Sequence, residues 1–210
     1  MGDVIVLADR IADRSRAPVG ARPAFFFDLA CPLCYLAAEQ VERLFSTVDW
    51  VPTAAAGLGG AHSIDQYERA ERRAAALRLP LVWPDRFAAA VPTALRASAH
   101  ATDAGTGDRF ALAASRLAFC GGFDLEDPEI LAEAGAAAGI PLEETLHAAG
   151  DHGRDVQLYA TARGLRRRGL STLPVIRVGR RWFQGEYAVA AAAELQRLRA
   201  LYGTSLAPSG

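Results

Sequence analysis

The pattern of apolar and polar positions near the start of the chain predicts a strand, a helix and a second strand. Pro23–Leu29 is apolar except for Asp28 and contains three phenylalanines, as expected of a central strand buried on both faces. From Tyr35 to Phe45, apolar positions recur at three- and four-residue spacing with charged residues between them. This spacing predicts an amphipathic helix. A second short strand is predicted at Val48–Pro52.

The middle of the chain has only helical signals. Proline and polar capping residues predict the helix starts, and glycines predict several of the ends. The signals are Ser63 with Gln66 for a helix to about Arg78, Pro92 for a second, Thr106 or Asp108 for a third that Gly121 and Gly122 end, Asp127 with Pro128 for a fourth ending near Gly139, and Asp151 for a last one ending at Gly169. We therefore expect residues 61–168 to form an all-helical block without strands.

Strand signals return at Pro174–Val178 and Arg181–Gln184, and the link Gly179-Arg180 between them predicts a hairpin. Apolar positions from Val189 to Leu201 predict a final amphipathic helix. The order β, α, β, helical insertion, β, β, α is typical of an α/β thioredoxin-like fold with a large all-helical insertion between the second and third strands. The expected parts are an N-terminal extension over 1–21, a thioredoxin-like domain over 22–60 and 169–205, and the inserted helical domain over 61–168.

Composition narrows the classes of partner. The 210-residue chain has 51% hydrophobic residues, and its 23 basic residues, all arginine, nearly balance 24 acidic ones for a net charge of -1. This balance gives no long-range attraction to nucleic acid or to an anionic membrane, so we expect neither partner. The apolar run Val4–Ala8 is shorter than a secretory signal requires, and no stretch is long enough to span a membrane. We therefore expect a cytoplasmic protein.

The candidate chemistry lies where the first strand meets the first helix, at Cys31-Pro-Leu-Cys34. Unpaired backbone N–H groups and the positive end of the helix dipole favour a thiolate at a helix start. Cys31, which we expect to point out of the turn, is therefore the candidate nucleophile, and Cys34 is the candidate resolving thiol. Since cytoplasmic thiols are kept reduced, a Cys-x-x-Cys in that compartment favours redox catalysis over a structural disulfide.

Two plainer interpretations of the cysteines are a zinc half-site and a pair of core residues. A structural zinc site needs four nitrogen or sulfur ligands, and the only other cysteine is Cys120, so no metal site is expected. Cys120 falls on an apolar helical face and is most simply a small core residue. The four histidines, His62, His100, His147 and His152, have no ligand spacing and are expected at surfaces or helix ends.

Three motifs in order resemble the DsbA-like thioredoxin-fold superfamily over roughly residues 22–201. They are Phe26-Phe-Asp-Leu-Ala-Cys-Pro-Leu-Cys-Tyr-Leu-Ala37, Leu79-Pro-Leu-Val-Trp-Pro84, and Thr172-Leu-Pro-Val175 with Phe183-Gln-Gly185. The resemblance implies that Pro174 is a cis proline facing the dithiol and that Leu173 offers its backbone to an extended substrate. Pro174 read alone could equally be an ordinary proline at a strand start. The candidate substrate contacts are Pro32, Leu33, Trp83, Thr172 and Leu173.

The resemblance points to two branches of the superfamily. Strongly oxidising members carry a histidine within the dithiol motif and an acid six residues before it, where this chain has Leu33 and Phe25. Asp28, Tyr35-Leu-Ala37 and the Leu79–Pro84 stretch are closer to the 2-hydroxychromene-2-carboxylate isomerases and kappa-class glutathione transferases. Those enzymes typically have serine where this chain has Cys31.

Three functions follow as hypotheses. The first is a thiol-disulfide oxidoreductase acting on a protein or small-molecule thiol or disulfide through a mixed disulfide, with no tightly bound cofactor and glutathione as a candidate co-substrate. The second is a glutathione-dependent isomerase or transferase acting on an apolar small molecule, and the third is a non-catalytic binding module. Asp28 either relays a proton or caps the helix after Cys31. A homodimer is a candidate assembly.

Overall fold

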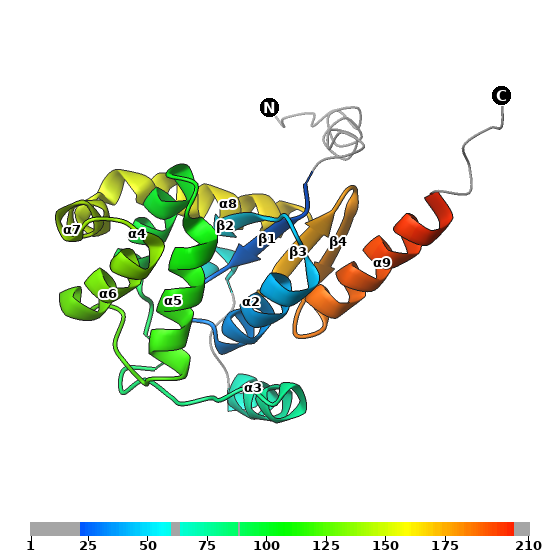
Figure 1. The fold of residues 1–210 in the computed structure, drawn as a ribbon, viewed down its shortest axis with the longest axis horizontal. Helices are drawn as coiled ribbons and strands as arrows, with labels where there is room; N and C mark the ends of the chain where they lie inside the picture. Colours follow the sequence, from blue (N-terminus) through cyan, green and yellow to red (C-terminus); the bar gives the residue numbers. More distant parts are fainter. Residues whose placement is uncertain (1–21, 60–63, 88, 204–210) are drawn as a thin grey trace, which may run out of the picture.

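A four-stranded mixed sheet lies at the centre of the computed structural model, which describes residues 22–59, 64–87 and 89–203 (Figure 1). The strand order is β2-β1-β3-β4. The strands are β1 (Ala24–Phe27), β2 (Asp49–Pro52), β3 (Val175–Val178) and β4 (Arg181–Gln184). β1 and β2 run parallel, whereas β3 is antiparallel to both β1 and β4. The predicted strands and hairpin are thus present, and the predicted N-terminal extension 1–21 lies outside the described residues.

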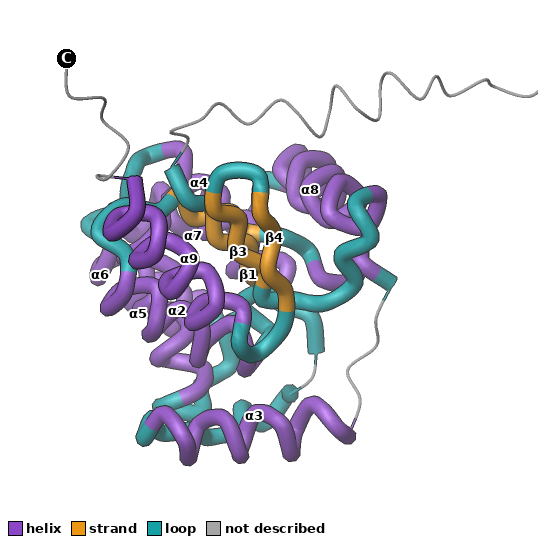
Figure 2. Tube along the Cα trace, turned by 90° about the vertical axis from the view of Figure 1, so that its right-hand side faces the viewer, coloured by secondary structure: helices purple, strands orange, loops and turns teal. Residues whose placement is uncertain are grey.

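Aromatic residues of β1 and β2 fill the core on one face of the sheet. Phe25 is fully buried, and its ring centroid lies 5.0 Å from that of Trp50 and 5.6 Å from that of Phe27. Helices α2 (Pro32–Leu44) and α9 (Ala188–Gly203) lie on one side of the sheet, and α8 (Asp155–Arg167) lies on the other (Figure 2). Phe25 and Phe27 are therefore buried, whereas Phe26, the residue between them, is partly buried.

The predicted all-helical block is present between β2 and β3. Its elements are η1 (Ala55–Leu58), α3 (Ile64–Leu77), α4 (Pro92–Asp103), α5 (Gly107–Phe119), α6 (Pro128–Ala138), α7 (Leu142–Gly150), η2 (His152–Arg154) and α8. The described part of this segment contains no strand. No described helix has the length and apolar character that a membrane crossing requires.

The prediction for the last part of the block was wrong in one respect. Asp151 caps the short 3-10 turn η2, where its side chain accepts a hydrogen bond from Gly153 N, rather than a helix reaching Gly169. The span predicted as one helix is occupied by η2 and by α8, which starts at Asp155, and α7, which ends at Gly150, was not predicted. Asp127 does cap α6 through Glu129 N, and Gly139 ends that helix with a φ of 78°. The predicted capping residue Ser63 lies outside the described residues.

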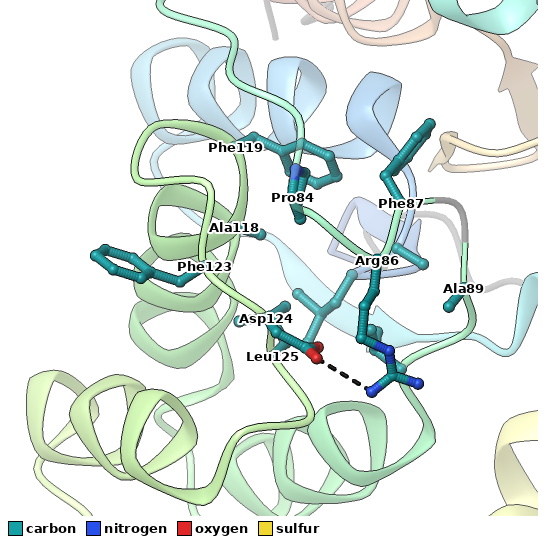
Figure 3. Close-up of a pocket in the computed structure, with 12 residues that line it drawn as sticks. Pro84, Arg86, Phe87, Ala89, Ala118, Phe119, Phe123, Asp124 and Leu125 are labelled. Carbon is teal, nitrogen blue, oxygen red and sulfur yellow. Dashed lines mark hydrogen bonds and ion pairs between the residues drawn. The ribbon is translucent and has the colours of Figure 1, made fainter.

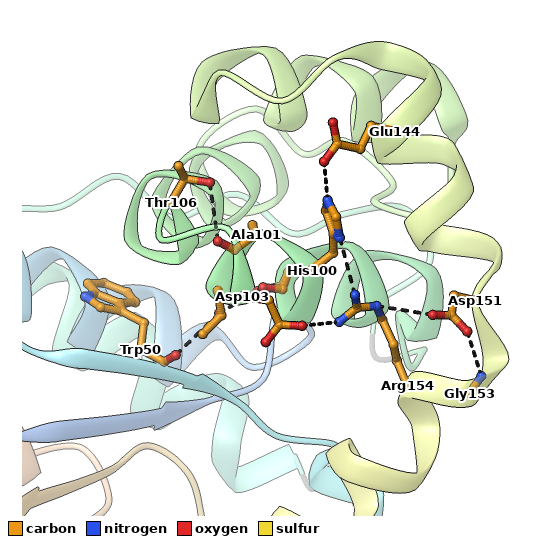
Figure 4. Close-up of polar contacts among 11 residues, drawn as sticks. Trp50, His100, Ala101, Asp103, Thr106, Glu144, Asp151, Gly153 and Arg154 are labelled. Carbon is orange, nitrogen blue, oxygen red and sulfur yellow. Dashed lines mark hydrogen bonds and ion pairs between the residues drawn. The ribbon is translucent and has the colours of Figure 1, made fainter.

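A network of ion pairs and hydrogen bonds holds the helical block together and joins it to the sheet (Figure 4). Arg154 pairs with Asp103 at 2.7 Å and with Asp151 at 3.4 Å, and His100 lies 2.6 Å from Glu144. The Thr102 hydroxyl, one residue before Asp103, lies 3.4 Å from the carbonyl oxygen of Trp50 in β2. These contacts set the position of α4 relative to the sheet.

Candidate active site

The dithiol lies at the carboxyl end of β1, where the chain leaves the sheet and starts α2. Cys31 is the N-cap residue of α2 and Pro32 occupies the first helical position. The Cys31 backbone donates to Asp28 O at 3.2 Å, and its carbonyl accepts from Cys34 N at 2.9 Å and Tyr35 N at 3.2 Å. Proline suits this position because its missing N–H would have no partner inside the helix. The local sequence thus fixes Cys31 at the positive end of the helix dipole.

Both thiols are free and they occupy different environments. Cys34 is 2% exposed and Cys31 is 9% exposed, so Cys31 is more buried than expected of a thiol that points out of the turn. The residues on either side account for this, since Ala30 and Leu33 are themselves buried and pack around the turn. Cys31 is nevertheless the more accessible sulfur of the pair.

The environment of Cys34 keeps it protonated. Burial raises the pKa of the Cys34 thiol well above its ordinary value, and its hydrogen bond with Cys31 and the charge of that group raise it further. A hydrogen bond with the Asp28 backbone acts in the opposite direction. Cys34 is therefore suited to be the resolving sulfur rather than the first nucleophile.

Asp28 holds together the two loops that frame the dithiol. The side chain is 5% exposed, and its oxygens accept hydrogen bonds from Ala30 N at 2.8 Å and Ala55 N at 2.7 Å. It therefore joins the β1–α2 loop to the start of η1 instead of capping α2 itself. A proton-relay role for Asp28 stays a prediction.

Pro174 lies at the same edge of the sheet. The Leu173–Pro174 peptide bond is cis, the configuration that the resemblance implies. β3 pairs Val175 with Phe26, so the residues before Val175 lie beside the end of β1 that leads to Cys31. Leu173 is buried, Thr172 is exposed, and the Pro174 carbonyl accepts from Gly185 N at 2.9 Å. The fold thus brings a cis proline and the dithiol to one edge, although they are far apart in sequence.

A small apolar depression lies next to the dithiol turn (Figure 3). Its volume is about 30 Å³, and Leu29, Ala30, Pro84, Phe87, Phe119 and Leu125 contribute to its walls. Arg86 and Asp124, which are also among its lining residues, form an ion pair at 3.1 Å. A space of this size holds a water molecule or a methyl group.

Two of the predicted substrate contacts, Leu33 and Trp83, are not among the residues that line this depression. Leu33 is 3% exposed and belongs to the core, because its position in the first turn of α2 faces inward. Trp83 does not line the depression; its ring packs 4.8 Å from Tyr67 and 4.7 Å from Phe87, and its Nε1 donates to Glu71 at 3.3 Å. Pro84 and Phe87, which are close to Trp83 in sequence, form the apolar wall that Trp83 was expected to form. Pro32 is also buried.

Tyr35 and Cys120 form a contact that the sequence analysis missed. The Tyr35 hydroxyl donates to Pro80 O at 3.0 Å and lies 3.1 Å from Cys120 Sγ. Burial, followed by the Cys120 contact, raises the pKa of Tyr35. Cys120 is the C-cap residue of α5 and is partly exposed, so it packs against the core from a helix end rather than from within a helical face. The Tyr-Leu-Ala after the dithiol was the available signal, but nothing local connects it to residue 120.

Metal binding has no support in the described part of the chain. No group of three or more His, Cys, Asp or Glu residues that could hold a metal ion occurs there. His100 is bound in the α4–α7 network, His147 and His152 are exposed, and His62 lies outside the described residues.

A much larger groove, of about 700 Å³, opens at the opposite end of the sheet. Its lining includes Arg22, Glu42, Phe45, Asp49, Trp50, Asp108 and Arg109. The sequence analysis did not anticipate it, because it forms between the end of α2 and the α4–α5 turn, which are distant in sequence.

Comparison with known proteins supports the fold. No family model and no curated protein sequence matches the chain. A solved 2-hydroxychromene-2-carboxylate isomerase superposes with a TM-score of 0.75 at 13% identity, over 89% of this chain and 100% of that one. A probable DsbA oxidoreductase from Streptomyces coelicolor gives 0.67 at 21% identity, over 87% and 90% of the two chains. The cytosolic disulfide reductase DsbM from Pseudomonas aeruginosa, solved with GSH, gives 0.60 at 18% identity, over 89% and 99%. The chain therefore has the thioredoxin-like fold with a helical insertion that these DsbA-like structures share.

Proposed function

We propose that this protein is a thiol-disulfide oxidoreductase that uses Cys31 and Cys34 through a mixed disulfide. The observation that carries the proposal is a pair of free thiols in the first turn of α2, at the sheet edge that also holds the cis Leu173–Pro174 bond. The DsbA-like and DsbM structures with the same fold support this class of chemistry.

The proposed thiol-disulfide exchange consists of two successive displacements at sulfur. The Cys31 thiolate attacks one sulfur of a substrate disulfide, a Cys31–substrate disulfide forms, and the other substrate sulfur leaves as a thiolate. Cys34 then loses its proton and attacks Cys31 Sγ, which closes the Cys31–Cys34 disulfide and releases the second substrate sulfur. Two electrons pass from the protein dithiol to the substrate disulfide, and the two leaving thiolates take up protons.

The surroundings of the two sulfurs support this order of attack. Cys31 is at the dipole end of α2 and is the more exposed of the two, whereas Cys34 is buried and its pKa is raised. A protonated, buried Cys34 does not compete as the first nucleophile, because the thiolate is the attacking species.

Glutathione is the candidate reductant in this proposal. Two glutathione molecules would return the oxidised dithiol to its reduced form and leave as glutathione disulfide, so no tightly bound cofactor is needed. The similarity to a disulfide reductase solved with GSH supports this choice, and that protein's cytosolic origin supports a cytoplasmic setting.

A glutathione-dependent isomerase is the second candidate, because the 2-hydroxychromene-2-carboxylate isomerase structure superposes with a TM-score of 0.75. The depression beside Ala30 argues against an aromatic substrate at that place. Its volume is about 30 Å³, whereas a cavity that takes up benzene is on the order of 150 Å³.

The test is to measure the mass and redox state of the Cys31–Cys34 peptide across mixtures of reduced and oxidised glutathione. A reversible loss of two hydrogens with a glutathione-dependent midpoint supports the oxidoreductase. Tight non-covalent binding of reduced glutathione without pairing of the cysteines would support the isomerase instead. Cys34→Ser should accumulate Cys31-linked partners on a non-reducing gel, and equal accumulation by Cys31→Ser would contradict the assigned order.

A further inference from the structure

The charges of this nearly neutral chain are unevenly distributed along it. Residues 157–185 contain seven arginines and no aspartate or glutamate, whereas residues 1–156 contain 14 arginines against 22 acidic residues. The basic segment comprises most of α8, the loop to Pro174 and the β3–β4 hairpin. A positive surface on an otherwise acidic molecule is a local feature that the net charge conceals.

The solvent side of α8 carries the first part of this surface. Val156 and Tyr159 are 72% and 40% exposed, and Arg163, Arg166 and Arg167 are exposed at the following three- and four-residue steps. These steps place the five side chains on one side of the helix. The opposite side, with Leu158, Ala162 and Leu165, is buried.

The three α8 arginines lack the ion pairs that exposed arginines make elsewhere in this chain. Arg163, Arg166 and Arg167 form no ion pair with any carboxylate of the described residues. By contrast Arg43, Arg72 and Arg197 each pair with a glutamate three or four residues earlier on the same helix. The positive charge of α8 is therefore not neutralised locally.

The surface continues onto the sheet. The guanidinium carbons of Arg168 and Arg177 lie 5.5 Å and 5.9 Å from the centre of the Trp182 ring, which also packs 5.6 Å from Phe26. Figure 2 shows α8 beside β4, on the side of the sheet away from α2 and α9. Trp182 thus holds two guanidinium groups between the end of α8 and the sheet.

The basic surface is within reach of the dithiol edge. Seven residue steps separate Arg167 from the cis Pro174, so the two lie at most about 25 Å apart. Ser171 N, within this loop, donates to the Gln184 side chain at 3.1 Å and so ties the loop to β4. One extended chain segment can contact both places.

We propose that this α8 surface, comprising Val156, Tyr159, Arg163, Arg166 and Arg167, docks an acidic segment of the protein whose disulfide reacts with Cys31. The proposal rests on the proposed function, because it assigns a place to a second part of the same substrate. Tyrosine and arginine are the residues that contribute most to protein interfaces, and the positive field accelerates encounter with an acidic partner.

The composition of the surface favours an acidic protein over a nucleic acid. Val156 and Tyr159 offer apolar contact that a phosphate backbone does not use. The faces of Trp182, which could stack on bases, are occupied by Arg168, Arg177 and Phe26.

The experiment uses the full chain carrying both Cys31→Ser and Cys34→Ser. It measures the affinity of this protein for a glutamate-rich peptide that also contains leucine and tyrosine. Neutralising Arg163→Gln, Arg166→Gln and Arg167→Gln together should weaken binding about tenfold. The matched control, Arg43→Gln, Arg72→Gln and Arg197→Gln, makes the same change in net charge and should leave binding within about twofold. Circular dichroism verifies that both triple variants stay folded.

Three outcomes would overturn the proposal: equal losses in the two triple variants, equal binding of a lysine-rich peptide of the same length, or tighter binding of oligothymidylate. Because the binding protein lacks both thiols, this result does not depend on catalysis. Failure of the proposed function would appear separately, as wild-type protein that binds the acidic peptide and reduces no disulfide placed within it.

Discussion

The two ends of the sheet, which α2 connects, differ in packing and in electrostatics. At the start of α2 the dithiol lies among buried residues beside a depression of about 30 Å³, whereas the end of α2 borders an open groove of about 700 Å³. The first end has the positive pole of the helix and the second the negative pole. The larger of these two hollows therefore lies at the end where a thiolate would be disfavoured, and the chemistry is expected at the closely packed end.

The packing at the dithiol end has a physical reason. Attack and resolution require two sulfurs in a defined geometry, and a well-packed turn maintains that geometry better than an open groove. Asp28 anchors this turn through two backbone N–H groups, whereas Asp49, which borders the groove, is exposed. The following predictions compare the two ends, starting with the largest effect.

Replacing Cys31 by serine should abolish disulfide exchange. A hydroxyl is not a nucleophile toward disulfides near neutral pH, so the rate of reduction of a small aromatic disulfide should fall by about 10³-fold or more. Cys120→Ser, which changes the remaining cysteine, should retain most of the rate. A residual rate near that of the unchanged protein would remove Cys31 from the mechanism.

Replacing Asp28 by alanine should lower the free energy of unfolding by about 2–4 kcal/mol, because two backbone N–H groups lose their acceptor. The measurement is urea unfolding of the reduced protein. Asp49→Ala at the opposite end is the matched control and should change stability by less than about 0.5 kcal/mol. Equal effects at the two positions would contradict the anchoring role of Asp28.

The reduced protein should lose stability as the pH rises above about 8.5, the ordinary pKa of cysteine. Since the pKa of Cys34 is raised in the folded state, the unfolded chain releases this proton first, and the free energy of unfolding decreases by at most about 1.4 kcal/mol per pH unit for this group. The stabilisation is fully present below that pH and is lost as the pH rises toward the folded pKa. Chemical unfolding at a series of alkaline pH values should show a shallower decrease for Cys34→Ala, and an unchanged slope would count against the assignment.

Removing two charges from the lining of the groove should have the smallest effect on stability and on the rate of disulfide reduction. Arg109→Gln with Asp108→Asn alters two exposed residues that line it, and surface substitutions of this kind usually change stability by less than about 0.5 kcal/mol. The rate of disulfide reduction should stay within about twofold of the unchanged protein. A large loss of rate would show that the groove takes part in the reaction.

Local patterns predicted much of the fold. The phenylalanine run, the hairpin signal and the final apolar periodicity each correspond to an observed element, since all three depend on neighbours within one strand or helix. Asp151 misled the prediction because aspartate caps a 3-10 turn as well as a helix, so the boundary between η2 and α8 could not be read from it.

The candidate site was predicted only in part. Cys31 and Cys34 were identified from their spacing, but the burial of Leu33 and the packing of Trp83 against Tyr67 depend on which face each residue presents to distant elements. The contact between Tyr35 and Cys120 joins residues 85 positions apart, so no local signal could indicate it.

The sequence by itself determined the dithiol at a helix start, the order of strands and helices, and the acid-free basic segment over 157–185, because each is a property of neighbouring residues. The tertiary structure decided that Pro174 shares an edge with the dithiol, that Asp28 joins two loops, and that Arg163, Arg166 and Arg167 form no ion pair among the described residues. Those facts depend on how the sheet and the helical block pack together, and packing brings together residues that the chain keeps far apart.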